Sequence, residues 1–93
     1  MNKGQLVEIV FRKAKLPSKA AAQRAVDVAL QAIMDAVAKG DSVTLSRFGS
    51  FRPAMRKGGR RFNPRTRQPM DVPSKRVPRF RAGQRFKKMV AKG

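Results

Sequence analysis

Positive charge is divided very unevenly between the two halves of this chain, which limits how much core the second half can contribute. Residues 1–46 contain seven bases and four acids, a net +3, whereas residues 47–93 contain sixteen bases and one acid, a net +15. Such asymmetry indicates a polyanionic partner bound mainly by the second half. A single domain of 93 residues is already small for a core of its own. If the basic half projects from it, oligomerisation is the expected source of further burial.

The densest basic run covers residues 56–67, where six of twelve positions are Lys or Arg and none is acidic. The cations alternate with glycines, one aromatic residue and an Asn-Pro step, a mixture of charge and turn-forming residues. This pattern predicts an extended arm that follows a phosphate backbone, with Pro64 as a rigid apolar tip. The alternative is a solvated, disordered basic tail, but expected strands on both sides favour an ordered arm.

The residue inventory argues against catalysis and against a bound cofactor or metal. The chain has no Cys and no His, and its five acids are scattered at Glu8, Asp27, Asp35, Asp41 and Asp71. No apolar run approaches the roughly 20 residues of a membrane span, and the first residues lack the apolar core of a secretory signal. We therefore expect a non-enzymatic, cytoplasmic protein without a membrane partner.

Two helices are predicted in the first forty residues. Apolar residues at helical spacing run from about Asn2 to Lys15, with Asn2 as the starting cap and a stop before Pro17. A second helix of roughly 21 residues has Ser18 as its N-cap and Gly40 as its C-terminal cap. Residues 1–40 are thus expected to form a helical dimerisation part.

A β-ribbon and a short helix are predicted for the remainder. Alternation at residues 43–46 followed by Arg47-Phe48-Gly49-Ser50-Phe51 indicates two strands joined by a turn, the second strand continuing through residues 52–56. A return strand is expected at residues 72–81, and Pro69, Pro73 and Pro78 favour an edge strand or an irregular ribbon over a central strand. The ribbon part thus covers residues 41–81 with the arm at about 56–75, and residues 82–93 hold a short helix over Gly83–Ala91.

This order of elements resembles the family of bacterial DNA-bending proteins that contains HU and integration host factor, and HU more closely. The resemblance rests on Met1-Asn2-Lys3, Gly40-Asp41, Phe48-Gly49-Ser50-Phe51, Asn63-Pro64-Arg65-Thr66 and Val77-Pro78-Arg79-Phe80, in that order along nearly the whole chain. It implies an α+β fold: two N-terminal helices, a three-stranded antiparallel β-ribbon with a protruding basic arm, and a short C-terminal helix. It also implies an intertwined homodimer whose arms reach into the minor groove of duplex DNA, with Pro64 as a wedge between base pairs.

The resemblance and the charge pattern together assign the binding residues. A histone-like, nucleoid-associated function follows, with low sequence specificity, a preference for bent, nicked or gapped DNA, and condensation of the bacterial chromosome. Phe48, Phe51, Phe80 and Phe86 are expected in the core and dimer interface. The expected DNA-contacting residues are Lys3, Arg47, Arg52, Arg56, Lys57, Arg60, Arg61, Phe62, Asn63, Pro64, Arg65, Thr66, Arg67, Lys75, Arg76, Arg79, Arg81, Gly83 and Gln84.

Several points depart from the family pattern or stay open. Arg61-Phe62 and Arg67 stand where the family commonly has Gly-Arg and Gly, so Phe62 either contacts DNA or covers the arm backbone. Ala82-Gly83-Gln84 replaces a Ser-Gly-Lys helix start, which removes a capping hydroxyl and one cation. Lys3 is expected to pair with Asp27 or to be freed for phosphate. An RNA-binding structural protein of the ribosomal type is the alternative function.

Overall fold

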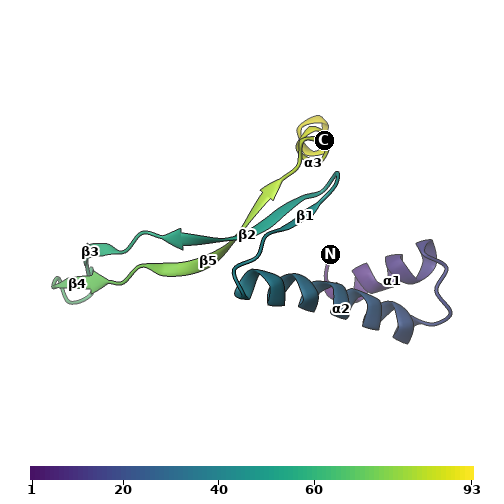
Figure 1. Ribbon diagram of the computed structural model, residues 1–93, viewed down its shortest axis with the longest axis horizontal. Helices are drawn as coiled ribbons and strands as arrows, with labels where there is room; N and C mark the ends of the chain where they lie inside the picture. Colours follow the sequence, from purple (N-terminus) through teal and green to yellow (C-terminus); the bar gives the residue numbers. More distant parts are fainter. The chain divides into compact units, whose positions relative to one another are not determined.

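The first of two compact units in the chain is a helical hairpin. The computed structural model describes all residues, Met1–Gly93, and divides into Met1–Asp35 and Ala36–Gly93. Helix α1 (Lys3–Lys13) lies beside α2 (Lys19–Ala38) in antiparallel orientation (Figure 1). Their contact buries Val7, Ala22 and Val26, and three partly buried residues pack against this core: Val10, Phe11 and Leu16. No helix of the protein is long and apolar enough to cross a bilayer.

The helix ends follow the predicted capping residues closely. Asn2 and Gln5 form a reciprocal capping box at the start of α1, and the Ser18 Oγ accepts a hydrogen bond of 3.0 Å from the Ala21 amide at the start of α2. Gly40 adopts a φ of +100° just after α2, which confirms it as the C-terminal cap. Helix α1 ends at Lys13 rather than at the predicted Lys15, because Lys15 already has a left-handed φ of 54°.

The second unit is built on a three-stranded antiparallel sheet in the order β1-β2-β5, comprising β1 (Val43–Leu45), β2 (Gly49–Arg56) and β5 (Lys75–Ala82). Strand β5 pairs only with β2, so it is an edge strand, the first of the two predicted alternatives; of the three prolines, Pro78 alone lies in it. The turn between β1 and β2 is formed by residues 46–48. The predicted turn was therefore placed too late, because Gly49 already pairs with both Leu45 and Ala82.

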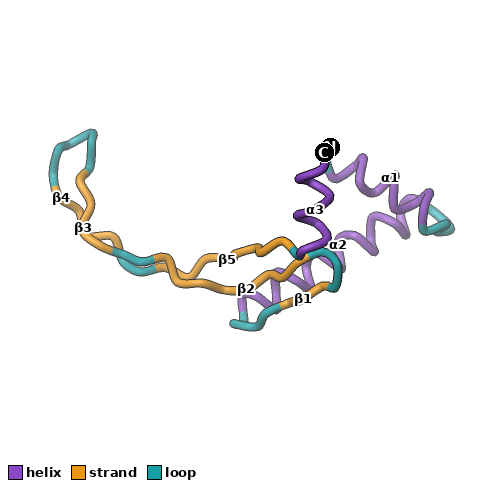
Figure 2. Tube along the Cα trace, turned by 90° about the horizontal axis from the view of Figure 1, so that it is seen from above, coloured by secondary structure: helices purple, strands orange, loops and turns teal.

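Beyond the three-stranded sheet, the arm forms a sheet of its own. Strands β3 (Gly59–Phe62) and β4 (Pro69–Val72) pair antiparallel, so the predicted return strand begins earlier than residue 72 and is interrupted before β5. The interruption falls where Gly58 faces Pro73 and Ser74: a Cβ at Gly58 would overlap the Val72 carbonyl oxygen and the Ser74 amide nitrogen. Only glycine permits this close approach, and past it the hairpin curves away from the direction of β2 and β5 (Figure 2).

Four phenylalanines pack together where the sheet meets the last helix, α3 (Gln84–Lys92). The ring centroids of Phe51 and Phe80 lie 4.8 Å apart, and Phe48 stacks on Phe86 at 5.6 Å. Offset and tilted ring contacts of this kind stabilise a core beyond the area that they bury. Phe48 and Phe80 nevertheless remain 42% and 43% exposed within one chain, so this cluster leaves apolar surface uncovered.

Candidate nucleic-acid interface

The register of β2 with β5 sorts the side chains of this ribbon onto two unlike faces. Because successive residues of a strand point to opposite faces, directly paired residues share one face. One face carries the pairs Phe51–Phe80, Pro53–Pro78 and Met55–Arg76. The other, which we call the cationic face, carries five bases: Arg52, Arg56, Lys75, Arg79 and Arg81. All five are exposed to solvent, and the apolar Ala54–Val77 pair lies between the pairs Arg52–Arg79 and Arg56–Lys75.

Two pairs of like charge oppose each other directly on the cationic face. Arg52 pairs with Arg79, and Arg56 pairs with Lys75. None of the four takes part in any of the protein's ion pairs. Like charges directly across two strands are destabilising, so this face has no internal source of neutralisation and is suited to an anionic ligand.

Arg76 is separated from the other predicted DNA-contacting cations. It lies on the opposite face of β5, paired with Met55, and its guanidinium donates a hydrogen bond of 2.7 Å to the Ala38 carbonyl oxygen. That carbonyl belongs to the last turn of α2, whose C=O groups lack partners within the helix. The structure therefore gives Arg76 a helix-capping role that charge alone did not reveal.

The tip of the arm is organised by Asn63. Its amide donates to the Gln68 carbonyl at 3.0 Å, its carbonyl accepts from the Arg67 amide at 2.7 Å, and its side-chain oxygen accepts from the Arg65 amide at 2.9 Å. Pro64 follows directly, is exposed and lacks an amide that would need a partner in this turn. Asn63, predicted to contact DNA, is thus the residue that shapes the turn and presents Pro64.

Most of the arm cations have no acidic partner. Arg60 lies opposite Asp71 with 3.6 Å between Nε and Oδ1, but both side chains are largely exposed and such a pair contributes little. Lys57, Arg61, Arg65 and Arg67 are exposed and form no ion pair. Phe62 sits among them with 64% of its surface exposed and lies opposite Pro69. The tip therefore combines unpaired positive charge with exposed apolar groups, including Phe62, Pro64 and Met70.

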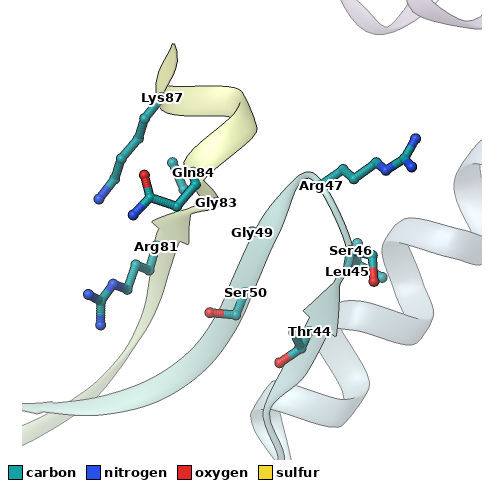
Figure 3. Close-up of a pocket in the computed structure, with 11 residues that line it drawn as sticks. Thr44, Leu45, Ser46, Arg47, Gly49, Ser50, Arg81, Gly83, Gln84 and Lys87 are labelled. Atoms are coloured by element: carbon teal, nitrogen blue, oxygen red, sulfur yellow. The ribbon is translucent and has the colours of Figure 1, made fainter. Parts of the chain in front are cut away.

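A third basic region lies where β5 enters α3. A shallow cavity of about 350 Å³ is lined by residues of β1, β2 and the β5–α3 junction. Arg81, Gln84 and Lys87 point to the same side of it, together with the Ser50 hydroxyl, whereas Arg47 points away (Figure 3). The sequence analysis did not include Lys87 and Ser50 among the expected DNA contacts. The position of Lys87 one turn beyond Gly83 was an available signal, whereas the position of Ser50 opposite Arg81 depends on the strand register.

Gly83, which was expected to contact DNA, connects two elements of the protein through its amide. Its amide donates to the Phe48 carbonyl oxygen at 2.8 Å, so this N–H is already used in joining α3 to the β1–β2 turn. No side chain caps the helix start. The amides available to an anion there are those of the first turn, from Gln84 onward.

Lys3 belongs to the helical unit rather than to the ribbon. Its Nζ lies 2.5 Å from the Asp27 Oδ1, with 54% and 43% of the two side chains exposed. The expected pair is therefore present, at a surface position where such pairs contribute about 0–1 kcal/mol. Lys3 is held by a weak interaction that an anionic ligand can replace at little cost.

Comparisons with known proteins identify the family. Residues 1–91 match the family model described as bacterial DNA-binding protein. The chain is 45% identical over 91 residues to the DNA-binding protein HU of Nostoc sp., covering 98% of this chain and 96% of that protein. It is 40% identical over 87 residues to the HU-beta protein of Neisseria meningitidis, covering 94% and 97% respectively.

Solved structures agree with these sequence relatives. An HU–DNA cocrystal structure from Anabaena has a TM-score of 0.93 and 44% identity, with both chains covered completely. HU from Thermotoga maritima has a TM-score of 0.67 and 30% identity, with 97% of this chain and 98% of that chain covered. The two-faced ribbon, the Asn63-Pro64 tip and these matches over nearly every residue all lead to one assignment: this chain belongs to the HU family of bacterial DNA-binding proteins.

Proposed function

We propose that this protein is an architectural DNA-binding protein that bends duplex DNA and condenses the bacterial chromosome. The observation that carries the proposal is the set of five exposed bases on one face of the β2–β5 ribbon, together with the unpaired cations of the arm. Phosphates supply the missing negative charge, and each neutralised phosphate releases condensed counterions. The Anabaena relative was crystallised with DNA, which supports the same ligand here.

The arm tip supports insertion into the minor groove. Pro64 is a compact apolar group at an exposed turn, and the bonds of Asn63 fix the turn that carries it. An apolar wedge partially unstacks a base step, at a cost of a few kcal/mol that backbone contacts along the bent duplex offset. The cations of the ribbon and arm are suited to binding phosphates rather than base edges. We therefore expect the protein to select DNA sites by their deformability rather than by their sequence.

We further propose that the functional unit is a homodimer. Each unit of the chain leaves apolar side chains exposed: Leu30 and Met34 on α2 are 45% and 57% exposed, and Phe48 and Phe80 are more than two-fifths exposed. The buried core of the single chain contains only Val7, Ala22, Val26 and Val37. A second copy covers such surfaces and gives the protein two arms, one for each side of a bend.

Binding to matched linear and nicked duplexes over a salt series tests this function. We expect a steep fall of affinity with salt, tighter binding to the nicked duplex, and a dimer mass in sedimentation. Arg61→Ala and Arg65→Ala should each weaken binding and reduce the salt slope by about 0.9 for each phosphate that is no longer neutralised. Arg24→Ala, an exposed cation of α2 outside the site, is the matched control. Affinity indifferent to salt and to DNA distortion would refute the proposal.

The RNA-binding alternative finds no support in the family match or in the HU relatives, which are named for DNA. The same assay decides it, with a structured RNA of equal length as competitor. We expect nicked duplex DNA to displace the RNA, and the opposite order would favour an RNA-associated function.

A further inference from the structure

The β2–β5 ribbon brings positive charges together at a cost to its own stability. Arg52 opposes Arg79 and Arg56 opposes Lys75, each pair in direct cross-strand register on the cationic face. In the distal hairpin, by contrast, Arg60 opposes Asp71, the one acid of residues 47–93. The two sheets of the same ribbon therefore differ in the sign of their cross-strand charge pairs: attraction near the tip and repulsion near the base.

Nothing in the free chain relieves this repulsion. Ala54 and Val77 are the cross-strand pair that separates the two charged pairs on the cationic face, and neither is polar. The four side chains are exposed and have no acidic neighbour within ion-pair distance. A β-branched or aromatic partner would be favourable at these strand positions, whereas directly opposed like charges are not.

We propose that Arg52–Arg79 and Arg56–Lys75 are two cross-strand phosphate clamps, each of which holds one DNA phosphate between its two cations. The ribbon is then a polyanion-dependent element: it is destabilised by its own charge in the free protein and stabilised when phosphates occupy the clamps. This inference rests on the proposed DNA-binding function and adds the site and its consequence for stability. An anion between two cations changes their repulsion into two charge-assisted hydrogen-bonded contacts.

The spacing of the two clamps suits a duplex backbone. Arg52 and Arg56 are four residues apart on one strand, so the clamps lie about 13 Å from each other along the ribbon. This separation is several times the roughly 3.4 Å of helix axis that each phosphate of one strand occupies. The two clamps can therefore engage phosphates separated along the duplex rather than compete for one.

Thermal unfolding of the free protein tests the repulsion. Arg52→Gln removes one charge of a clamp, and Arg52→Glu recreates the opposite-charge arrangement that Arg60 and Asp71 already show. At low salt we expect both variants to unfold at a temperature higher by about 2–4 °C, with the larger rise for Glu. The difference should shrink at high salt because screening removes the repulsion. An unchanged or lowered unfolding temperature for both variants would overturn the proposal.

Anion binding tests the clamp itself. Sodium pyrophosphate should raise the unfolding temperature of the natural protein more than sodium chloride at equal ionic strength, and the excess should fall for Arg52→Gln. For duplex DNA, the double variant Arg52→Gln/Arg79→Gln removes both cations of one clamp. It should reduce the salt slope by about 0.9 per clamp and weaken binding about eightfold per clamp at 0.1 M salt, because the phosphate of that clamp is then no longer neutralised. Arg24→Gln, outside the ribbon, should change neither. An unaltered slope and affinity for Arg52→Gln/Arg79→Gln, with steep salt dependence in the natural protein, would refute the clamps while leaving the DNA-binding function intact.

Discussion

The Arg76 guanidinium donates a 2.7 Å hydrogen bond to the Ala38 carbonyl oxygen and so joins the first residues of strand β5 to the end of helix α2. A cation at a helix C-terminus interacts favourably with the partial negative charge of the unpaired carbonyls. Arg76 is also the only base of β5 on the face that carries Phe80 and Pro78. Among the cations of the ribbon, it therefore belongs to the scaffold rather than to the cationic face.

We accordingly predict that Arg76→Ala lowers stability more than DNA affinity. Loss of a hydrogen bond from a charged donor at an exposed site should cost about 1 kcal/mol in the free energy of unfolding. Chemical denaturation measures that cost, with Arg79→Ala as the matched control because Arg79 lies on the same strand but makes no such bond. Arg79→Ala should instead weaken DNA binding without destabilising the protein. Equal destabilisation by both variants would contradict the capping role.

Phe62 is predicted to contact the wall of the groove rather than to act as a wedge. Its side chain projects from a face of β3, since strand side chains stand roughly perpendicular to the ribbon, whereas Pro64 lies in the turn beyond. Phe62→Ala should therefore weaken DNA binding by about threefold to tenfold, with little change in bend angle. The salt slope should stay constant, because an apolar contact releases no counterion.

Met55→Ala supplies the control for Phe62→Ala. Met55 is 60% exposed, close to the 64% of Phe62, but lies in strand β2, outside the β3–β4 hairpin. Its side chain is on the face opposite the cationic one. The Met55→Ala substitution should leave the affinity for DNA unchanged. If Phe62→Ala behaves in the same way, the ring only covers the arm backbone.

Much of the fold could be predicted from the sequence because its signals are local. Asn2, Ser18 and Gly40 cap helices through contacts with residues at most four positions away, and the structure places each of them as expected. Pro78 of β5 likewise acts through its own missing amide, which favours an edge position for that strand. Family motifs supplied the order of the elements, and the structure confirms it.

The relationships that could not be predicted depend on pairing between distant residues. The opposition of Arg52 to Arg79 requires the β2–β5 register, and a slip of one residue would place Arg52 on the other face. The capping bond of Arg76 spans 38 positions, and the break at Gly58 arises only where Val72 and Ser74 approach it. A count of basic residues gives these cations equal weight, whereas the register places Arg52 and Arg79 on the cationic face and Arg76 on the opposite face.

Pro64→Ala should reduce DNA bending more than it reduces affinity. Removing the wedge takes an apolar group out of the groove but also saves the cost of unstacking, a few kcal/mol per step, so the two changes partly cancel in the binding free energy. Energy transfer between dyes at the ends of a short duplex measures the bend, and Pro17→Ala, in the loop between α1 and α2, is the control. A bend angle that survives Pro64→Ala would exclude the wedge.

Arg67 occupies a backbone position that favours glycine. We predict that its charge contributes to DNA binding although its backbone conformation costs stability. Its φ is 56°, a left-handed value that costs a non-glycine residue about 1–2 kcal/mol, while its amide donates to the Asn63 carbonyl at 2.7 Å. Arg67→Gly should slow hydrogen exchange of that amide about fivefold or more and reduce the salt slope of DNA binding. Arg67→Asn separates the two effects, because Asn tolerates the left-handed region but carries no charge. It should reduce the salt slope as much as Gly does while slowing exchange less. If both variants left the slope unchanged, Arg67 would be a turn residue without a role in binding.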